Sequence, residues 1–540
     1  MSRGIVRTDP HKNMKLEEYL VMADNEMYKA KKKKKNARKF YKGMDISSLP
    51  EHIDGGGKFY TMDERQIEAF ELLKQNNVNS IRLRIWNEPG NVPESKGYCD
   101  LKHTLEMAKK IKENQMHFVL DFHYSDYWAD PGQQRKPKAW ENLSYEELKK
   151  AVHDYTKEVL DALDDIGCLP DMVQVGNEIR SGMLFPDGAV PDYKQLAELV
   201  NEGIRACREK SENIEVMIHL DQGGRFYYLK EWFDSMFEAG MEPIDAIGIS
   251  FYSFWHGTFM DLRDSMKSLI ERYKLPVYVV ETAHPWRQCE NEHVSAALMK
   301  TAGLPAGIEE QRRSLELVMQ IAAQASDNLD SGVYYWEPLC LPGETYGTWD
   351  ENMGMLNEKG CALPSFEVYK DFSINKLPIG NIDEYMESLY EVDDSEAAPA
   401  GTNLIENGDF SNGLSDWWVT KDSDDVVCEA KDGEVLVESK SNFKLDIFRD
   451  VYVQKAGKYT LSVQYRGTNT TGVKVALVLR AISFDGEKVY KEDIFPSDVR
   501  FVNHMIEGVE LPAGQIQVGI AIDSPPVTGR IKNFSLVEIE

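Results

Sequence analysis

The sequence predicts two folded parts of different class: an α/β part that forms a (β/α)8 TIM barrel, followed by an all-β jelly-roll sandwich. At 540 residues the chain is too long for one ordinary hydrophobic core. From residue 40 to about 375, short apolar runs alternate with amphipathic helical patterns, as a parallel sheet with helical crossovers requires. From 403 to 540, short alternating strands separated by Gly, Asn and Asp turns favour a sandwich.

Eight apolar runs in the first part are short, rich in strand-forming residues and bounded by turn residues, which is typical of buried parallel strands. We expect these strands at Phe40–Asp45, Ser80–Ile85, His117–Phe122, Met172–Asn177, Ile214–Leu220, Ala246–Ser250, Val277–Glu281 and Gly332–Trp336. We expect helices between them, for example at Asp63–Gln75, Leu101–Glu113, Tyr145–Leu163, Tyr193–Lys210 and Glu309–Ala325. The carboxyl ends of the strands should then carry the active site.

The same patterns predict domain boundaries. Residues 40–380 form the barrel, and an acidic, then small and Pro-containing stretch at 381–402 is typical of a linker. Residues 403–540 form the sandwich, with strands expected at Tyr459–Tyr465, Gly472–Leu479 and Gln515–Ile522.

Residues 1–39 form a charged extension that differs from the rest of the chain. The segment Ala23–Lys31, followed by four lysines and Asn36, resembles the closing helix of a diguanylate cyclase domain. The resemblance covers only residues 16–37, and the signature loop and nucleotide site of that family are absent, so no cyclase activity is expected. A solvated basic helix without a function is the alternative.

Composition excludes several classes of function. A net charge of −28 argues against nucleic-acid binding, which needs a clustered basic surface. The seven cysteines are widely spaced without a CxxC pair, which indicates free buried thiols rather than disulfides or a zinc site. The chain has no apolar run long enough to span a membrane. Its N-terminus lacks the apolar core of a signal peptide, which indicates a cytoplasmic location.

Two glutamates follow buried strands abruptly, in the segments Val175–Ile179 and Val279–Ala283. Either Glu178 or Glu281 alone could simply cap a strand or pair with an arginine. Together, at equivalent places in a repeating pattern, they predict a carboxylate pair that acts on one glycosidic bond. We expect Glu178 to be the acid/base, with a raised pKa, and Glu281 to be the nucleophile.

Further polar and aromatic residues are expected around this pair. Arg82 and Arg84 share one face of a strand, and we favour Arg82 as the group that hydrogen-bonds the nucleophile and keeps it ionised. The alternative is an ion pair that only fills the barrel. Asn177 should donate to a sugar hydroxyl, Tyr252 should orient Glu281, and Trp336 should form the floor of the subsite that holds the distorted sugar. The remaining candidates for substrate contact or support are Asp45, Trp86, His123, Asp126, Trp128, Asp221 and Trp286.

Several barrel segments carry a family resemblance: Gly43–Ser48, Asn79–Asn87, Asp121–Asp126 with Trp128–Pro131, Gly176–Gly182, Ile218–Asp221, Ser250–Tyr252, Glu281–Thr282 with Pro285, and Tyr335–Pro338. Through them the chain resembles glycoside hydrolase family 53, the arabinogalactan endo-β-1,4-galactanases. The resemblance implies Glu178 as acid/base, Glu281 as nucleophile, retention of configuration and a role in pectin degradation. It implies β-1,4-galactan or galacto-oligosaccharides as substrate, and secretion by family habit.

The chain departs from the family pattern at Ala283–Trp286, in the long loop from Trp286 to Ile308, and at Leu341–Met355. These differences concern the substrate subsites rather than the catalytic chemistry. The two-glutamate mechanism requires no cofactor. Bacterial members of the family can hold a structural calcium between those two loops. The sequence shows oxygen ligands there but no ligand spacing, so no metal site is predicted.

The opening of the tail, Asn403–Phe410 followed by Trp417 and Trp418, resembles that of jelly-roll carbohydrate-binding modules. The alternative is a sandwich that only packs against the barrel. For the whole chain, two alternatives to a galactanase stay open. One is another retaining β-glycanase of the same clan, of the mannanase or cellulase type. The other is a non-catalytic polysaccharide-binding or sensory protein.

Overall fold

The computed structural model describes residues 38–288, 299, 302–341, 352–389, 402–423, 425–468, 473–483, 486–494, 496 and 501–539. The cyclase-like segment at 16–37 lies outside the described residues. So do residues 390–401 of the expected linker, together with most of the two loops considered for calcium.

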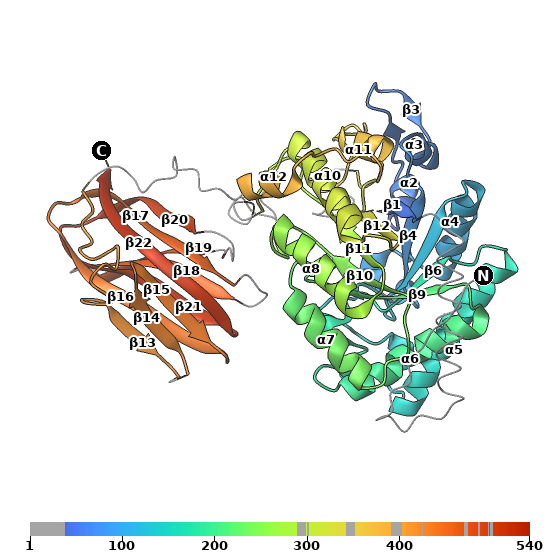
Figure 1. The fold of residues 1–540 in the computed structure, drawn as a ribbon, viewed down its shortest axis with the longest axis horizontal. Coiled ribbons are helices and arrows are strands. Elements are labelled where there is room, and N and C mark those ends of the chain that lie inside the picture. Colours follow the sequence, from blue (N-terminus) through green and yellow to red (C-terminus); the bar gives the residue numbers. More distant parts are fainter. Residues whose placement is uncertain are drawn as a thin grey trace.

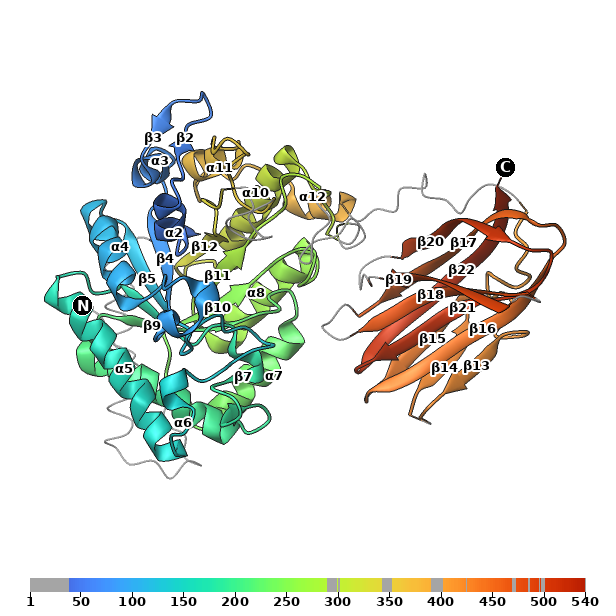
Figure 2. The same ribbon diagram turned by 180° about the vertical axis from the view of Figure 1, so that it is seen from behind.

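Eight parallel strands close into a barrel with helices around it (Figures 1 and 2). In barrel order the strands are β1 (Phe40–Asp45), β12 (Ser331–Trp336), β11 (Val277–Thr282), β10 (Ala246–Ser250), β9 (Glu215–Leu220), β6 (Met172–Val175), β5 (His117–Phe122) and β4 (Ser80–Ile85). The predicted TIM barrel is therefore confirmed, and the expected strands differ from the observed ones by two residues or fewer at either end.

The outer layer consists of α3 (Ala69–Gln75), α4 (Leu101–Glu113), α5 (Tyr145–Asp165), α6 (Tyr193–Lys210), α7 (Phe226–Glu238), α8 (Phe259–Tyr273) and α10 (Ile308–Ala325). Local sequence fixes where several of these helices begin. Ser144 and Glu147 form a capping box at the start of α5, and Thr258 with Asp261 does the same for α8. Leu and Val residues on the inner face of α5 are fully buried against the barrel.

One helix is shorter than the sequence predicts. The expected helix at Asp63–Gln75 begins only at Ala69, because the preceding residues form a small hairpin of β2 (Phe59–Tyr60) and β3 (Gln66–Ile67). Thr61 Oγ1 donates to Asp63 and accepts from the backbone N–H of Arg65, which closes the turn. Short polar side chains that hydrogen-bond nearby backbone favour such a turn over a helix start.

The barrel interior is layered. The inward side chains near the amino ends of the strands form an apolar and aromatic layer of Tyr41, Val119, Met172, Met217, Ala246, Tyr278, Val280 and Tyr334. Gly43 leaves the room that the Tyr334 ring takes, since a Cβ there would lie 2.2 Å from that ring. The strand positions beyond this layer carry charged and amide side chains, which therefore lie at the carboxyl-end mouth.

Short helices complete the barrel unit: α2 (Leu49–Asp54), α11 (Ser365–Asp371) and α12 (Ile382–Ser388). Helix α12 falls in the range expected to be linker. Met386 is fully buried and Arg263 of α8 pairs with Asp383, so this helix packs against the barrel. We therefore place the end of the barrel unit at Leu389.

The C-terminal part is a sandwich of two five-stranded antiparallel sheets. One sheet has the order β13 (Trp418–Lys421), β16 (Phe443–Val453), β21 (Gly514–Ser524), β18 (Lys474–Ser483), β19 (Gly486–Ile494). The other has the order β14 (Val427–Lys431), β15 (Glu434–Ser439), β22 (Val527–Ile539), β17 (Gly457–Gly467), β20 (Val502–Leu511). Alternate residues of both sheets face inward and form one separate core.

Among the described residues, no helix is long and apolar enough to cross a membrane.

Candidate active site

Glu178 reaches the mouth of the barrel through a sharp turn after β6. Gly176 has φ +83, and Glu178 itself lies in the left-handed region with φ 47 and ψ 47. A left-handed glutamate is strained, and such strain is concentrated at functional sites. The turn ends β6 at Val175, earlier than the sequence predicts, and starts a short 3-10 helix at Ile179–Ser181. Glu281 lies within β11, whose last residue is Thr282.

The two glutamates lie close together. One carboxylate oxygen of Glu178, one of Glu281 and a ring nitrogen of His219 all lie within 4.8 Å of one another. Carboxyl groups that act on opposite sides of an attacking water lie about 6.5–9.5 Å apart, whereas a nucleophile and its partner acid lie about 5–5.5 Å apart. The observed spacing fits the second arrangement.

Arg82 binds the carboxylates on the inner side of the site. Its guanidinium is buried and contacts Glu281 at 3.0 Å, Asp45 at 2.7 Å and Asp121 at 2.8 Å. It also donates to the Asn177 side-chain oxygen at 2.9 Å. Arg82, and not Arg84, is therefore the arginine that contacts Glu281.

Tyr252, which follows β10, holds the other oxygen of Glu281. Its buried hydroxyl donates to Glu281 Oε2 at 3.2 Å, while Arg82 approaches Oε1. Burial nevertheless raises the pKa of Glu281 to about 7, because Arg82 is shared with Asp45 and Asp121 and offsets only part of the desolvation. Arg82 thus lowers the pKa of Glu281, as expected, but burial and the charges of Asp121 and Asp45 outweigh it.

The pKa of Glu178 is also raised, well above its usual value. Burial is the largest cause, followed by the negative charges of Glu281 and Asp221, while a hydrogen bond from Ser250 opposes the rise. In the part of the chain that the structure describes, no guanidinium forms an ion pair with Glu178 as Arg82 does with Glu281. When the pair holds one proton, that proton is favoured on Glu178 and the charge on Glu281.

Arg84 belongs to a second cluster beside the first. It pairs with Glu337, which directly follows β12, and donates to Ser48 Oγ at 2.8 Å. Its guanidinium stacks over Trp128 with 4.2 Å to the ring centroid, and Trp128 packs on Trp336 with 5.7 Å between ring centroids. These half-buried rings form an aromatic wall at the mouth, which suits the apolar face of a sugar.

Two predicted candidates support loops. His123 Nδ1 accepts from Trp86 Nε1 and from the backbone N–H of Ala129, and its Nε2 lies 3.1 Å from Asp121. Asp126 accepts from the backbone N–H groups of Glu88 and Lys138. These contacts fit the supporting role expected for His123 and Asp126, and a contact of either residue with the substrate stays a prediction.

The remaining predicted residues are placed as follows. Asn177 donates to the Ala129 carbonyl at 2.8 Å, so its second amide N–H is the group available for a ligand. Asp221 forms a two-pronged pair with Arg180, at 2.7 and 3.1 Å. Trp286 is buried, with Arg287 stacked over its ring at 4.7 Å.

Sequence reasoning missed five residues that complete the site. These are Asp121, Gln174, His219, Ser250 and Glu337, all buried at or beside strand ends. Each is a polar residue inside or directly after a strand whose other residues are mostly apolar. A polar residue at such a position is a signal that could have identified them.

The spacing of Glu178, His219 and Glu281 could also suit a cation. Both ring nitrogens of His219 already have hydrogen-bond partners, however, and Glu281 is paired with Arg82. We therefore do not identify these residues as metal ligands.

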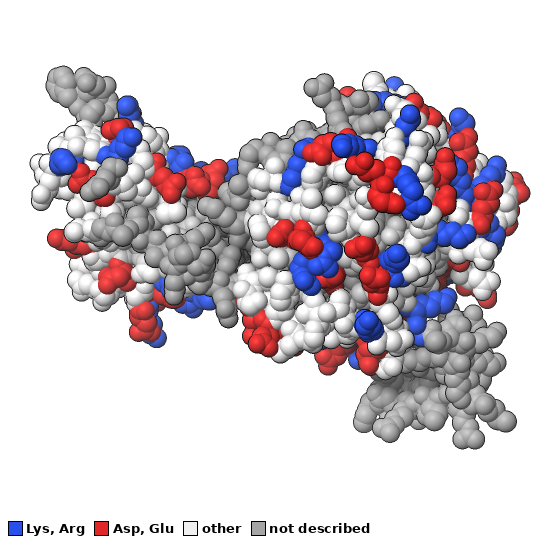
Figure 3. All heavy atoms as spheres, turned by 90° about the horizontal axis from the view of Figure 1, so that it is seen from above, with Lys and Arg blue, Asp and Glu red and all other residues white. Residues whose placement is uncertain are grey.

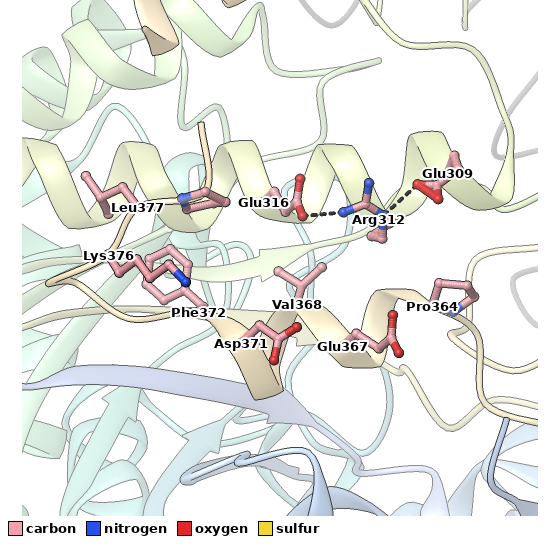
Figure 4. Close-up of a pocket in the computed structure, with 11 residues that line it drawn as sticks. Glu309, Arg312, Glu316, Pro364, Glu367, Val368, Asp371, Phe372, Lys376 and Leu377 are labelled. Carbon is pink, nitrogen blue, oxygen red and sulfur yellow. Dashed lines mark hydrogen bonds and ion pairs between the residues drawn. The ribbon is translucent and has the colours of Figure 1, made fainter. Parts of the chain in front are cut away.

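A separate hollow lies outside the barrel, between α10 and the segment Pro364–Pro378 (Figure 4). Its charged side chains pair with one another, as Arg312 does with Glu309 and Glu316. None of the strand-end residues described above lines it, so it is not the site of the chemistry.

On the face shown in Figure 3, acidic and basic side chains are interspersed over the barrel, which fits a neutral ligand better than a polyanion.

Comparisons with known proteins agree with this geometry. The model of glycosyl hydrolase family 53 matches residues 41–369. The chain is 34% identical over 384 residues to an endo-β-1,4-galactanase of Bacillus subtilis, covering 63% of this chain and 87% of that protein. It is 32% identical over 348 residues to an arabinogalactan endo-β-1,4-galactanase of Cellvibrio japonicus, covering 61% and 90%. Among solved structures, the family 53 catalytic domain of Ignisphaera aggregans matches with a TM-score of 0.58 and 35% identity, covering 61% of this chain and 95% of that one.

Proposed function

The chain belongs to glycosyl hydrolase family 53, and we propose that its barrel is an endo-acting β-1,4-galactanase that cleaves type I arabinogalactan with retention of configuration. The observation that carries the mechanism is the close carboxylate pair, with Arg82 and Tyr252 on Glu281 and neither on Glu178. That asymmetry supports Glu281 as the nucleophile and Glu178 as the acid/base. The two galactanases named above support the choice of substrate.

In the first step, a Glu281 oxygen attacks the anomeric carbon while Glu178 gives its proton to the departing glycosidic oxygen. The carbon–oxygen bond breaks and the sugar becomes esterified to Glu281. Arg82 and Tyr252 hold both oxygens of Glu281, which aligns the attacking lone pair before substrate arrives.

In the second step, Glu178, now a carboxylate, removes a proton from water. The water oxygen attacks the same carbon, and Glu281 leaves as a carboxylate. Two inversions give net retention. Both steps use only side chains of this protein and water, so the chemistry needs no cofactor.

Substrate positioning is assigned to the groups around the pair. We propose that the second amide N–H of Asn177 donates to the 2-hydroxyl of the reacting sugar, a contact that strengthens in the transition state. Trp336 and Trp128 offer ring faces to neighbouring sugars. His123, Asp126 and Asp45 hold the loops and the arginine that position these groups.

The second domain, residues 403–540, is proposed to bind the polysaccharide. Trp417 is core, whereas Trp418 faces outward and is 54% exposed. Trp418 lies beside Phe448 on the outer face of its sheet, and Tyr452, which is 69% exposed, lies four residues further along β16 on that face. Exposed rings on one face of a sheet suit stacking on a sugar chain.

Release of reducing ends from linear β-1,4-galactan tests the proposal, with mannan and carboxymethyl cellulose assayed in parallel. Turnover of galactan at least about a hundredfold faster than of the other two polymers is expected, because a site that hydrogen-bonds specific hydroxyls rejects sugars that lack them. Faster cleavage of mannan or cellulose would favour the other clan members. No cleavage of any polymer would favour a binding protein.

A further inference from the structure

A buried chain of hydrogen bonds runs from Glu178 into the barrel. Ser250 Oγ lies 2.5 Å from Glu178 Oε1, and His219 Nε2 lies 2.8 Å from Ser250 Oγ. On the far side of the ring, His219 Nδ1 lies 3.0 Å from the Asn177 side-chain oxygen. Ser250 and His219 are both fully buried, and neither has a role in the two catalytic steps above.

The imidazole of His219 is neutral, because burial, followed by the charge of Arg82, lowers its pKa well below its usual value. A neutral ring carries one N–H. The Asn177 oxygen lies 3.0 Å from Nδ1, and Gln174 Nε2 lies 3.1 Å from the same nitrogen. The two N–H groups of Gln174 have oxygen acceptors in Asp121, at 2.5 Å, and in Asn177, at 3.2 Å. We therefore assign the ring N–H to Nδ1, facing the Asn177 oxygen, which leaves Nε2 as an acceptor facing Ser250. Arg82 and Gln174 also donate to the Asn177 oxygen and keep it oriented as an acceptor.

Ser250 has one proton and two partners. When Glu178 is protonated, its O–H can donate to Ser250 Oγ while the serine donates to His219 Nε2. Once Glu178 has given up its proton, the serine O–H can turn to the carboxylate, since a hydrogen bond to a charged acceptor is about twice as strong as a neutral one.

We propose that Ser250 is a positioning residue whose hydroxyl turns between His219 and Glu178 as the acid/base cycles, and that His219 competes for that hydroxyl. This inference rests on the proposed function and adds a regulator of its acid/base group. The two neighbours act in opposite senses. Ser250 favours the Glu178 carboxylate, whereas His219 draws the serine proton away from it.

Other charges face the same groups and stay unchanged in the variants below. Those near Glu178 are Glu281 of β11, Asp221 after β9, Asp130 after β5 and Arg180 of the following 3-10 helix. Those near His219 are Arg82, His123 and His256. If the Ser250 and His219 variants shift the pKa of Glu178 in opposite directions, the cause is therefore the hydrogen-bond chain from Glu178 through Ser250 to His219.

The test is the pH profile of kcat/KM on galactan, whose alkaline limb reports loss of the acid's proton in the free enzyme. Ser250→Ala should move that limb upward by about one unit. His219→Leu, which removes the competing acceptor, should move it downward by about half a unit. His219→Gln keeps an acceptor oxygen and should restore the wild-type limb. The double variant Ser250→Ala with His219→Leu should match Ser250→Ala alone.

Ser253→Ala is the matched control. The Ser253 hydroxyl is buried three positions along the chain and has no hydrogen-bond partner among the described residues, so its removal should leave the limb in place. Titration of the Glu178 carboxyl by 13C NMR of glutamate-labelled protein, assigned with Glu178→Gln, gives the same comparison without turnover. If the wild-type protein is inactive on galactan, the proposed function is refuted, and the NMR titration still decides whether Ser250 and His219 act on the pKa of Glu178. Shifts of the same sign in the two single variants, or a lowered rate with no shift in either, would overturn the inference.

Discussion

The hydroxyl of Tyr252 offers the sharpest test of how Glu281 is held. Tyr252→Phe removes one oxygen and keeps the ring, which packs on Phe254, Trp255 and His256. Glu281 then keeps its contact with Arg82 at 3.0 Å and loses the 3.2 Å hydrogen bond to Oε2. The fold should therefore be preserved while one side of the nucleophile is released.

The magnitude follows from that one bond. A hydrogen bond to a charged group contributes about 1.5–3 kcal/mol, and a 3.2 Å contact belongs at the lower end. About 1.5 kcal/mol corresponds to about one pKa unit and to a rate factor of about ten. Because the bond favours the carboxylate, its loss raises the pKa of Glu281 further above the wild-type value of about 7.

The assay is kcat/KM on galactan between pH 5 and 9. Glu281 must be ionised to attack, so the acidic limb should move upward by about one unit, and the plateau should fall about tenfold. Tyr145→Phe is the control, because the Tyr145 hydroxyl donates to the Gln195 carbonyl between α5 and α6, in the outer helix layer, and the charges near it are Glu198, Asp192 and Glu146 rather than the catalytic pair. An unshifted acidic limb in Tyr252→Phe, with a plateau within twofold of wild type, would refute the reasoning.

Glu178→Gln should lower turnover of galactan by about 10²–10⁴-fold, as loss of a general acid does, and a rate above a tenth of wild type would exclude Glu178 as the acid. The same substitution should raise the Tm at pH 8. A carboxyl whose folded-state pKa lies above its unfolded value of 4.5 costs stability once pH exceeds 4.5, so the gain should shrink as pH falls toward 4.5. An equal gain at pH 4 and pH 8 would contradict the raised pKa. In the full chain carrying Glu281→Gln, Trp418→Ala should weaken retardation in galactan affinity gels, whereas unchanged retardation would remove Trp418 from the proposed binding face.

Periodicity was enough to predict the barrel because its strands are buried on both faces and flanked by turn residues. Ser80–Ile85 and Ala246–Ser250 were predicted to the residue for that reason. The hairpin before Ala69 was missed because Thr61, Asp63 and Arg65 close a turn through side-chain hydrogen bonds that leave a helix-like spacing of charges. The local sequence pattern before Ala69 does not distinguish a hairpin turn from the first turn of a helix.

The site was predictable where a residue's position on one strand decides its role. Glu178 and Glu281 end apolar runs, and the alternation of Arg82 and Arg84 placed both arginines in the barrel. What the sequence could not show is sharing across strands: Arg82 serves three carboxylates, and Ser250 reaches Glu178 from a strand 72 residues away in the chain. Burial raises the pKa of Glu281, and the sharing of Arg82 is why this arginine offsets only part of that rise.

The central claim is that Glu178 and Glu281 act in two successive displacements at one carbon. The most direct measurement is proton NMR of the anomeric signals during the first minutes of galactan hydrolysis, before mutarotation mixes them. Carboxylate oxygens within 4.8 Å of each other predict that the β-anomer appears first. If the α-anomer appears first, water attacks directly and the assignment of Glu281 as nucleophile is wrong.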